Sequence, residues 1–438
     1  MKKQTQIRFA LTGATGFLGR NLLLEIVKQN YKNLSDIEIL ILGRSEKENS
    51  LRNRIADILR EEVLDYVNDS SLDIQNFLKM IMDRIKCVNI ALGEPRLGLN
   101  HDDYQVLSSR TIDFFYHIAA SVDLRHGKKV EEELEKTNIG GTQDILNLVK
   151  SLKVKEFSYV GTAYECGKTY GKVMPDYINL NQEFRSPYEK AKLKAEILVR
   201  NFQKQTGIRC RYFRPSVTCG RLIEGLIGAT PKFDVFYSWA VFFLKYKQAK
   251  ISKENFINTP FKVDFRFYAS KTGGLNIVPV DLAAKIMYHS CITNDNNDSY
   301  HLTNKEETPH PLYTSMMLEA INITGMKNVY SMPTNLNRFE SFYYKAIDQL
   351  MPYITQESIS FDTRSSEAVC DKANISYPII DKNNFLKLMN YAKMKQFGLI
   401  NNNKIDHAPI KNKLDLSLDR IFIPNILPES TTSSSVRI

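Results

Sequence analysis

Short apolar runs alternate with longer amphipathic stretches along the first half of the chain. A run that is apolar throughout is typical of a parallel strand covered on both faces. We expect six such strands, at residues 7–11, 37–42, 88–92, 114–118, 156–160 and 210–214. Helical periodicity fills the stretches between them, as at residues 21–27, 47–86, 142–152 and 188–205. This alternation predicts an α/β fold built on a Rossmann-type, doubly wound parallel sheet.

A glycine-rich turn joins the first expected strand to the first expected helix. Gly13 can form a tight turn, Gly16 has no Cβ that would block a pyrophosphate, and Gly19 lets the helix pack closely on the strand. The N-terminus of that helix offers free N–H groups to phosphates. Strand, glycine turn and helix in this order predict a dinucleotide-binding site.

The pattern of apolar positions divides the chain after Gly220. Residues 1–220 form the expected dinucleotide-binding domain, and 271–304, which includes an expected strand at 276–280, return to it. Residues 221–427 are expected to form a smaller, mostly helical substrate domain built from interleaved C-terminal segments. The Ser/Thr-rich end, 428–438, is expected to be disordered.

The end of the second expected strand indicates which dinucleotide binds. Enzymes that use NAD usually carry Asp or Glu there, to hold the ribose hydroxyls. Here the strand is followed by Arg44, which can bind a 2′-phosphate, and Arg20 could reach the same phosphate from the first helix. This favours NADP(H) as the cofactor; the alternative is that Arg44 is only a solvated strand end.

Two residue types suited to proton transfer share one face of a predicted helix. Tyr188 and Lys192 are four residues apart. An ammonium group close to a phenol favours the phenolate, so we expect Lys192 to lower the tyrosine pKa from about 10 and to make it usable in acid–base catalysis. Thr162 directly follows the fifth strand, at the sheet edge where open α/β folds place their sites, and could hydrogen-bond the same substrate oxygen. The alternatives are that Tyr188 and Lys192 only form a solvated helix face and that Thr162 only ends a strand.

Together these motifs resemble the extended short-chain dehydrogenase/reductases. Within that superfamily they resemble the fatty acyl-CoA reductase and carrier-protein thioester reductase group, which has a male-sterility-like NAD(P)-binding domain. The resemblance covers roughly residues 5–305 and is carried by the segments 12–20, 96–99, 117–122, 138–142, 161–164 and 278–281. Two positions depart from the group: Ala91 stands where an aspartate is common, and Gly161 replaces a serine.

The resemblance implies roles for individual residues. Thr162, Tyr188 and Lys192 would be catalytic, and Tyr188 and Lys192 would also contact the cofactor. The other implied cofactor-binding residues are Gly13, Thr15, Gly16, Phe17, Leu18, Gly19, Arg20, Arg44, Ala119, Ala120, Asn138 and Pro215. No metal is implied.

The activity implied by the resemblance is NADPH-dependent reduction of an acyl thioester to the aldehyde, and a further reduction to the alcohol is left open. The alternative keeps the fold and changes the substrate to a ketone, a sterol-like secondary alcohol or a nucleotide sugar. A non-catalytic cofactor-binding scaffold is a third class. The presence of Thr162, Tyr188 and Lys192 argues against that class.

Composition and net charge indicate the cellular compartment and the class of binding partner. The six cysteines include no Cys-x-x-Cys pair, which argues against a disulfide framework or a zinc site and fits a reducing, cytoplasmic compartment. No apolar run is long enough to span a bilayer. The net charge of +10 suits an anionic partner. We expect acyl-CoA or an acyl carrier protein to deliver the thioester in trans, and no nucleic acid to bind.

The most aromatic stretch, residues 233–244, lies in the expected substrate domain and is followed by Lys245, Lys247 and Lys250. It could be a buried helix packed on the core. Alternatively it could be a wall of an acyl-chain tunnel or a surface that meets a carrier protein or, peripherally, a membrane. In the second case the lysines would face the anionic partner.

Overall fold

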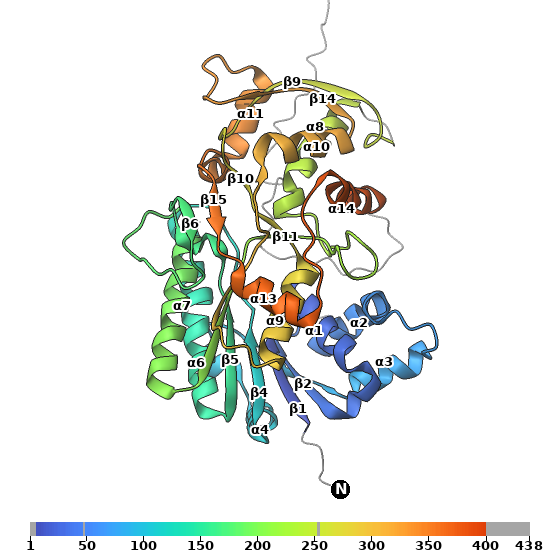
Figure 1. The fold of residues 1–438 in the computed structure, drawn as a ribbon, viewed down its shortest axis with the longest axis vertical. Helices are drawn as coiled ribbons and strands as arrows, with labels where there is room; N and C mark the ends of the chain where they lie inside the picture. The colour runs from blue at the N-terminus through green and yellow to red at the C-terminus, as the bar shows by residue number, and fades with distance from the viewer. Residues whose placement is uncertain (1–5, 47–48, 252–254, 400–438) are drawn as a thin grey trace, which may run out of the picture. The chain divides into compact units, whose positions relative to one another are not determined.

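The centre of the fold is a seven-stranded, entirely parallel sheet (Figure 1). The computed structural model describes residues 6–46, 49–251 and 255–399. The sheet order is β12-β7-β5-β4-β1-β2-β3. The strand bounds are β1 Ile7–Thr12, β2 Ile37–Gly43, β3 Ile85–Asn89, β4 Ile112–His117, β5 Val154–Val160, β7 Arg209–Pro215 and β12 Ser299–Leu302. The predicted doubly wound sheet is thus confirmed, and its order reverses between β1 and β4, the position at which such sheets bind ligands.

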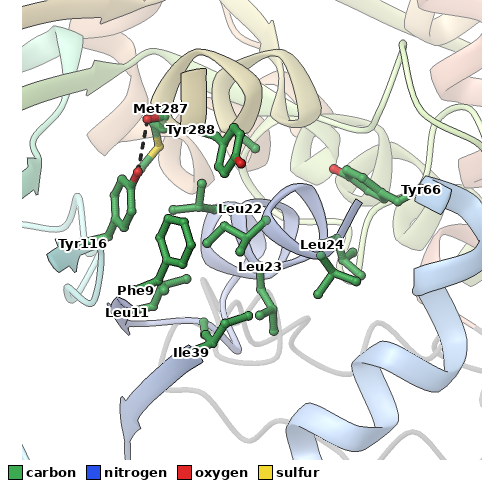
Figure 2. Close-up of a cluster of buried hydrophobic side chains, with 14 of the residues drawn as sticks. Phe9, Leu11, Leu22, Leu23, Leu24, Ile39, Tyr66, Tyr116, Met287 and Tyr288 are labelled. Carbon is green, nitrogen blue, oxygen red and sulfur yellow. Dashed lines mark hydrogen bonds between the residues drawn. The ribbon is translucent and has the colours of Figure 1, made fainter. Parts of the chain in front are cut away.

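Helices cover both faces of this sheet. Side chains of β1 alternate between them: Phe9 and Leu11 belong to one buried cluster and Ala10 to the other. The first cluster, partly drawn in Figure 2, includes α1 (Phe17–Asn30), α2 (Leu51–Val67) and α9 (Val280–Ile292). The second includes α4 (His101–Ser108), α6 (Gly141–Ser151) and α7 (Pro187–Thr206). Burial on both faces is why the strands read as continuous apolar runs.

The remaining elements connect the sheet or form the C-terminal segments. In the first half these are β6 (Gly171–Val173), α3 (Ile74–Met82), α5 (Lys128–Leu134), a π-helical turn (Glu135–Gly140) and a 3₁₀ turn (Ala163–Cys166). The later strands are β8 Val217–Cys219, β9 Phe261–Tyr268, β10 Gly274–Leu275, β11 Ile277–Pro279, β13 Thr308–Pro309, β14 Ile323–Val329 and β15 Ile359–Phe361. The later helices are α8 Ser238–Ile251, α10 His310–Ala320, α11 Arg338–Ala346, α12 Met351–Ile354, α13 Arg364–Ala373 and α14 Lys382–Met394.

Two strand predictions were wrong in position. The third strand is Ile85–Asn89 instead of 88–92, because residues before the apolar run also pair with β2. The strand expected at 276–280 exists as β11, but it pairs with β8 outside the main sheet, and Val280 already begins α9. The seventh strand of the main sheet is β12, which pairs with β7. The predicted tail, 428–438, and residues 400–427 lie outside the described residues.

The aromatic stretch 233–244 packs within the C-terminal segments. Trp239 on α8 donates its indole N–H to the Tyr343 hydroxyl at 2.8 Å, and the Phe243 ring lies 5.6 Å from that of Phe265 on β9. These contacts favour the interpretation as a buried helix. Lys247 is also buried: its Nζ donates to the carbonyl oxygens of Ile257 and Ile321, at 3.0 and 2.7 Å. The suggestion that Lys247 faces an anionic partner was therefore wrong.

In the part of the chain that the structure describes, no helix is long and apolar enough to cross a membrane.

Candidate active site

The glycine turn after β1 packs closely against neighbouring backbone because three positions carry no side chain. Gly13 has φ +75°, and a Cβ there would lie 2.7 Å from the backbone nitrogen of Ala119. A Cβ on Gly19 would lie 2.1 Å from the Gly13 carbonyl oxygen, so only glycine allows α1 to approach the turn this closely. Gly16 is the N-cap of α1; no side chain caps this helix, and its first turn carries no acidic residue. These features fit the pyrophosphate of a dinucleotide.

Three arginines lie around this turn, and they differ in the ion pairs and hydrogen bonds that their guanidinium groups make. Arg44 follows β2 and is exposed, and within the described residues its guanidinium has no ion-pair partner. Arg20 is mostly buried: it donates to Glu62 at 2.9 Å and to the Thr15 carbonyl at 3.1 Å. Arg54 on α2 donates to the Thr15 hydroxyl at 3.1 Å and to the Arg44 carbonyl at 3.2 Å. Sequence reasoning missed Arg54, since only the packing of α2 brings it to the glycine turn.

A hydrogen-bond network fixes the loop that follows β4. Both nitrogens of the buried His117 imidazole are engaged, with the hydroxyl oxygens of Thr12 at 2.9 Å and Thr142 at 3.2 Å. Thr12 Oγ1 accepts the backbone N–H of Ala119 at 3.2 Å. Burial lowers the pKa of His117 to about 3, so the ring is neutral at physiological pH. Ala119 and Ala120 are thereby held beside Gly13 at the switch point of the sheet.

Asn138 fixes the same loop from the opposite side. It lies on the π-helical turn and is buried. Its side-chain oxygen accepts the Ser121 N–H at 2.7 Å, and its side-chain nitrogen donates to the Ser121 carbonyl at 2.9 Å. Such turns inside helices often occur at functional sites.

Thr162 lies at the carboxyl end of β5, where it caps a short 3₁₀ turn. Its hydroxyl donates to the Pro215 carbonyl at 3.3 Å and accepts the Tyr164 N–H at 3.4 Å. Glu165 completes the cap by accepting the backbone N–H of Thr162 at 3.4 Å. Pro215 ends β7, so Thr162 contacts the neighbouring strand.

Tyr188 and Lys192 lie on the first turns of α7, which packs against the 3₁₀ turn of Thr162. Tyr188 is half-buried, and among the described residues its hydroxyl makes no hydrogen bond. Lys192 is buried; its Nζ donates to the Val160 carbonyl at 2.5 Å and lies 4.6 Å from the centre of the Tyr159 ring. The fold therefore brings Thr162, Tyr188 and Lys192 to the end of β5.

The expected lowering of the Tyr188 pKa is wrong. Burial raises the pKa of Tyr188, and the carboxylates of Glu165 and Glu189 raise it further. Burial also lowers the pKa of Lys192, to about 8, although Glu165 and Glu196 oppose that effect. The ammonium of Lys192 is directed to a backbone carbonyl, and this is why the simple tyrosine–lysine argument fails.

A buried cluster of charges supports the Thr162 turn. Arg214 on β7 contacts Glu165 at 2.5 Å and Glu196 of α7 at 2.7 Å. Burial raises the pKa of Glu165 well above its usual value. Against the effect of burial, Arg214 lowers the pKa of Glu196 to about 2. Within this pair, Glu196 therefore keeps its negative charge more readily than Glu165.

The same cluster explains the departure at Gly161. A Cβ at that position would lie 2.8 Å from Oε2 of Glu165. The serine common in the group thus has no room beside this glutamate.

Within the described residues, no group of His, Cys, Asp and Glu side chains could hold a metal ion, and all six cysteines are free.

Comparison with known proteins identifies relatives for most of the chain. The family model described as "male sterility protein" matches residues 11–287, more than half of the chain. A linear gramicidin synthase chain of Brevibacillus parabrevis is 27% identical over 307 residues, which are 68% of this chain and 5% of that protein. Human fatty acyl-CoA reductase 1 is 28% identical over 155 residues, 35% of this chain and 27% of that enzyme. The chain thus spans only a small part of these relatives.

Among solved structures, the terminal R domain from the myxalamid PKS-NRPS biosynthetic pathway has the same fold. It matches with a TM-score of 0.69 at 21% sequence identity, and the match covers 90% of this chain and 92% of that domain. The region that the family model matches is an NAD(P)-binding domain, and it includes the glycine turn and the uncapped start of α1.

Proposed function

The chain belongs to the male sterility protein family, and from this premise we propose that it reduces an acyl thioester to an aldehyde with NADPH. The observation that carries the proposal is the meeting of Thr162, Tyr188 and Lys192 at the carboxyl end of β5, next to an NAD(P)-binding turn. The relatives include enzymes named fatty acyl-CoA reductase and carboxylic acid reductase, which supports this class of substrate.

The proposed chemistry needs hydrogen-bond donors at the thioester carbonyl oxygen. The hydroxyl of Tyr188 has no hydrogen bond among the described residues, so it is available to this oxygen. Thr162 makes only long hydrogen bonds, of 3.3 and 3.4 Å, and can turn its hydroxyl toward the same atom. Two donors aimed at an oxygen that becomes negative stabilise the transition state.

In the proposed reaction, each bond change and each nearby side chain has a defined role. When bound, NADPH supplies a hydride to the carbonyl carbon. The carbon–sulfur bond then breaks, and the thiolate takes up a proton and leaves as a thiol, so that the products are the aldehyde, the thiol and NADP⁺. Lys192 keeps a positive charge near the reacting oxygen and binds the nicotinamide ribose, and Asn138 holds the neighbouring loop.

The arginines around the glycine turn support NADP(H) over NAD(H). Arg44 is exposed and free of ion pairs within the described residues, and Arg54 lies beside it with its guanidinium on Thr15. A 2′-phosphate at this position would be bound by two guanidinium groups. Arg54 also lies 3.3 Å from the exposed carboxylate of Glu46, which the phosphate would have to displace. Arg20 contributes less directly, because Glu62 engages it at 2.9 Å. We expect Arg44→Ala and Arg54→Ala to weaken NADPH binding at least ~10-fold and to leave NADH binding within about twofold, as measured by fluorescence titration.

The thioester would come from coenzyme A or from an acyl carrier protein, and the free cysteines suit the cytoplasm. We assign cofactor binding to residues 1–220 and 271–304, and substrate binding to the segments within 221–427. Reduction could continue from the aldehyde to the alcohol.

The deciding experiment follows NADPH oxidation by the purified protein with a panel of acyl-CoAs. Free thiol and aldehyde are measured in the same samples. One thiol released per NADPH supports reduction to the aldehyde, and half a thiol per NADPH indicates the alcohol. Turnover of free ketones without any thiol release would instead favour a ketone reductase.

A further inference from the structure

One buried arginine connects the neighbourhoods of two catalytic residues, Thr162 and Tyr188, to the C-terminal segments. Arg185 lies three residues before Tyr188, and its side chain is 1% exposed. Its Nη1 donates to Glu189 at 2.9 Å and its Nε donates to Gln356. The guanidinium carbon lies 5.4 Å from the centre of the Tyr353 ring and 5.7 Å from that of Tyr164. Tyr164 follows Thr162 by two residues, so the arginine lies between the neighbourhoods of the two catalytic residues.

Three polar atoms in this neighbourhood are buried and unpaired. Within the described part of the chain, Nη2 of Arg185, the hydroxyl of Tyr164 and Oε1 of Glu307 have no hydrogen-bond partner. The other carboxylate oxygen of Glu307 is fully used: it accepts from Ser358 Oγ at 3.0 Å and from the N–H groups of Gly274 and Ile359 at 3.2 and 3.3 Å. Buried polar groups are almost always paired, so three unpaired ones together call for a partner that the chain does not supply.

These three atoms belong to one site. The Arg185 guanidinium lies 5.7 Å from the centre of the Tyr164 ring. Glu307 is tied to β15 by the N–H of Ile359, and Phe361 on the same strand packs edge-on against the Tyr164 ring at 5.9 Å. In line with this placement, the Glu307 carboxylate adds to the effect of burial in raising the pKa of Tyr164, and the Arg185 guanidinium opposes it. The site therefore offers two donors and one acceptor.

We propose that Tyr164, Arg185 and Glu307 form a subsite for a polar group on the acyl chain, one that both accepts and donates a hydrogen bond. This rests on the proposed thioester reduction. A hydroxyl or a secondary amide has this chemistry: its oxygen accepts from Tyr164 and Arg185, and its O–H or N–H donates to Glu307. The group would lie near the thioester, because Tyr164 belongs to the 3₁₀ turn that Thr162 caps and the Arg185 guanidinium lies against the Tyr164 ring.

A plain aliphatic chain fits this subsite poorly. It would cover the three polar atoms without pairing them, and the unpaired atoms would lose the water that could otherwise reach them. Sites built to hydrogen-bond a substrate discriminate strongly against analogues that lack the polar group. The subsite thus selects among thioesters that the catalytic residues alone would not distinguish.

The test compares kcat/KM for matched acyl-CoAs: octanoyl, 3-hydroxyoctanoyl, and an N-acylglycyl chain of similar length. We expect the wild type to prefer one polar substrate over octanoyl-CoA at least ~10-fold, and the identity of that substrate distinguishes the hydroxyl from the amide. Tyr164→Phe removes a hydroxyl that makes no side-chain hydrogen bond within the described residues, so its fold is kept. It should reduce the preference to about twofold or less, whereas the exposed control Tyr170→Phe should retain it.

Other outcomes would overturn the proposal. Equal kcat/KM for all three substrates, or an unchanged preference in Tyr164→Phe, would show that the three atoms only enclose a structural water. The thioester reaction itself would still stand in either case. If no thioester released a thiol at all, the proposed function would fail and the subsite with it. Thermal unfolding of Tyr164→Phe, measured beside the wild type, confirms that a lost preference does not reflect a damaged fold.

Discussion

At the scale of single residues, Tyr188 is the group whose role is most directly testable. Its hydroxyl is unpaired within the described residues, so Tyr188→Phe removes a donor without breaking a protein hydrogen bond. We expect kcat to fall about 10²- to 10⁴-fold while the dissociation constant for NADPH changes less than about twofold, since the phenol ring remains. Steady-state kinetics and cofactor titration measure the two. Normal turnover in this variant, or an equal loss in Tyr170→Phe, would remove Tyr188 from the catalytic set.

The pKa of Lys192 predicts how the reaction depends on pH. Burial lowers this pKa to about 8, so the ammonium is present below pH 8 and is lost above it. We expect kcat/KM to be level on the acid side and to fall above about pH 8, by up to tenfold per pH unit. In Lys192→Arg the charge persists, and the fall should disappear at a lower overall rate. A pH profile of the variant that still declines at pH 8 would assign the titration to another group.

Sequence spacing found Thr162, Tyr188 and Lys192 because their relation is local: a strand end, and two positions on one helix. It did not find Arg54, which reaches the glycine turn from a separate helix. Nor could it explain Gly161, whose missing side chain makes room for Glu165, a residue held from β7 by Arg214. Contacts that depend on the packing of several elements at once cannot be predicted from sequence spacing.

At the scale of elements, the approach of α1 to the glycine turn can be tested with one methyl group. A Cβ on Gly19 would lie 2.1 Å from the Gly13 carbonyl oxygen, so Gly19→Ala must push α1 away from the turn. We expect NADPH binding to weaken more than ~10-fold and stability to fall by about 1–3 kcal/mol. The matched control is Gly140→Ala, also in helical conformation, where the new Cβ would lie 3.6 Å from the nearest atom. Differential scanning calorimetry and cofactor titration should separate the two variants, and equal behaviour would contradict the steric argument.

The sequence predicts an element well where one local pattern determines it. It predicts an element less well where pairing with distant parts of the chain determines it. The glycine turn and the helix of Tyr188 follow from periodicity and turn chemistry. The third strand begins three residues before the expected run, because pairing with β2 extends across Lys86 to Ile85. Lys247 looked like a surface cation, but the packing of α8 buries its ammonium between two backbone carbonyls. Whether a charged side chain is exposed cannot be known from the sequence until the packing of the neighbouring elements is known.

At the scale of the whole molecule, the sheet was predictable and the C-terminal segments were not. Alternating strands and helices determine a parallel, doubly wound sheet almost by themselves, since connections are right-handed and both faces must be covered. Strands after Gly220 form small two-stranded sheets, such as β9 with β14, or β15 with β6 from the first half of the chain. These pairings join distant parts of the chain, and no local sequence pattern predicts them.

The net charge of the molecule leads to the last prediction. A charge of +10 attracts phosphate-bearing thioesters such as acyl-CoA or an acyl-carrier protein, and dissolved salt screens that attraction over a Debye length of about 10 Å at 0.1 M. We expect KM for acyl-CoA to rise several-fold between about 0.05 M and about 0.5 M salt. The control is the same acyl group on N-acetylcysteamine, which has no phosphate, and its KM should change less than about twofold. If both KM values respond equally, salt acts on the acyl site or the cofactor, and the positive charge of this chain has no part in choosing the thioester's carrier.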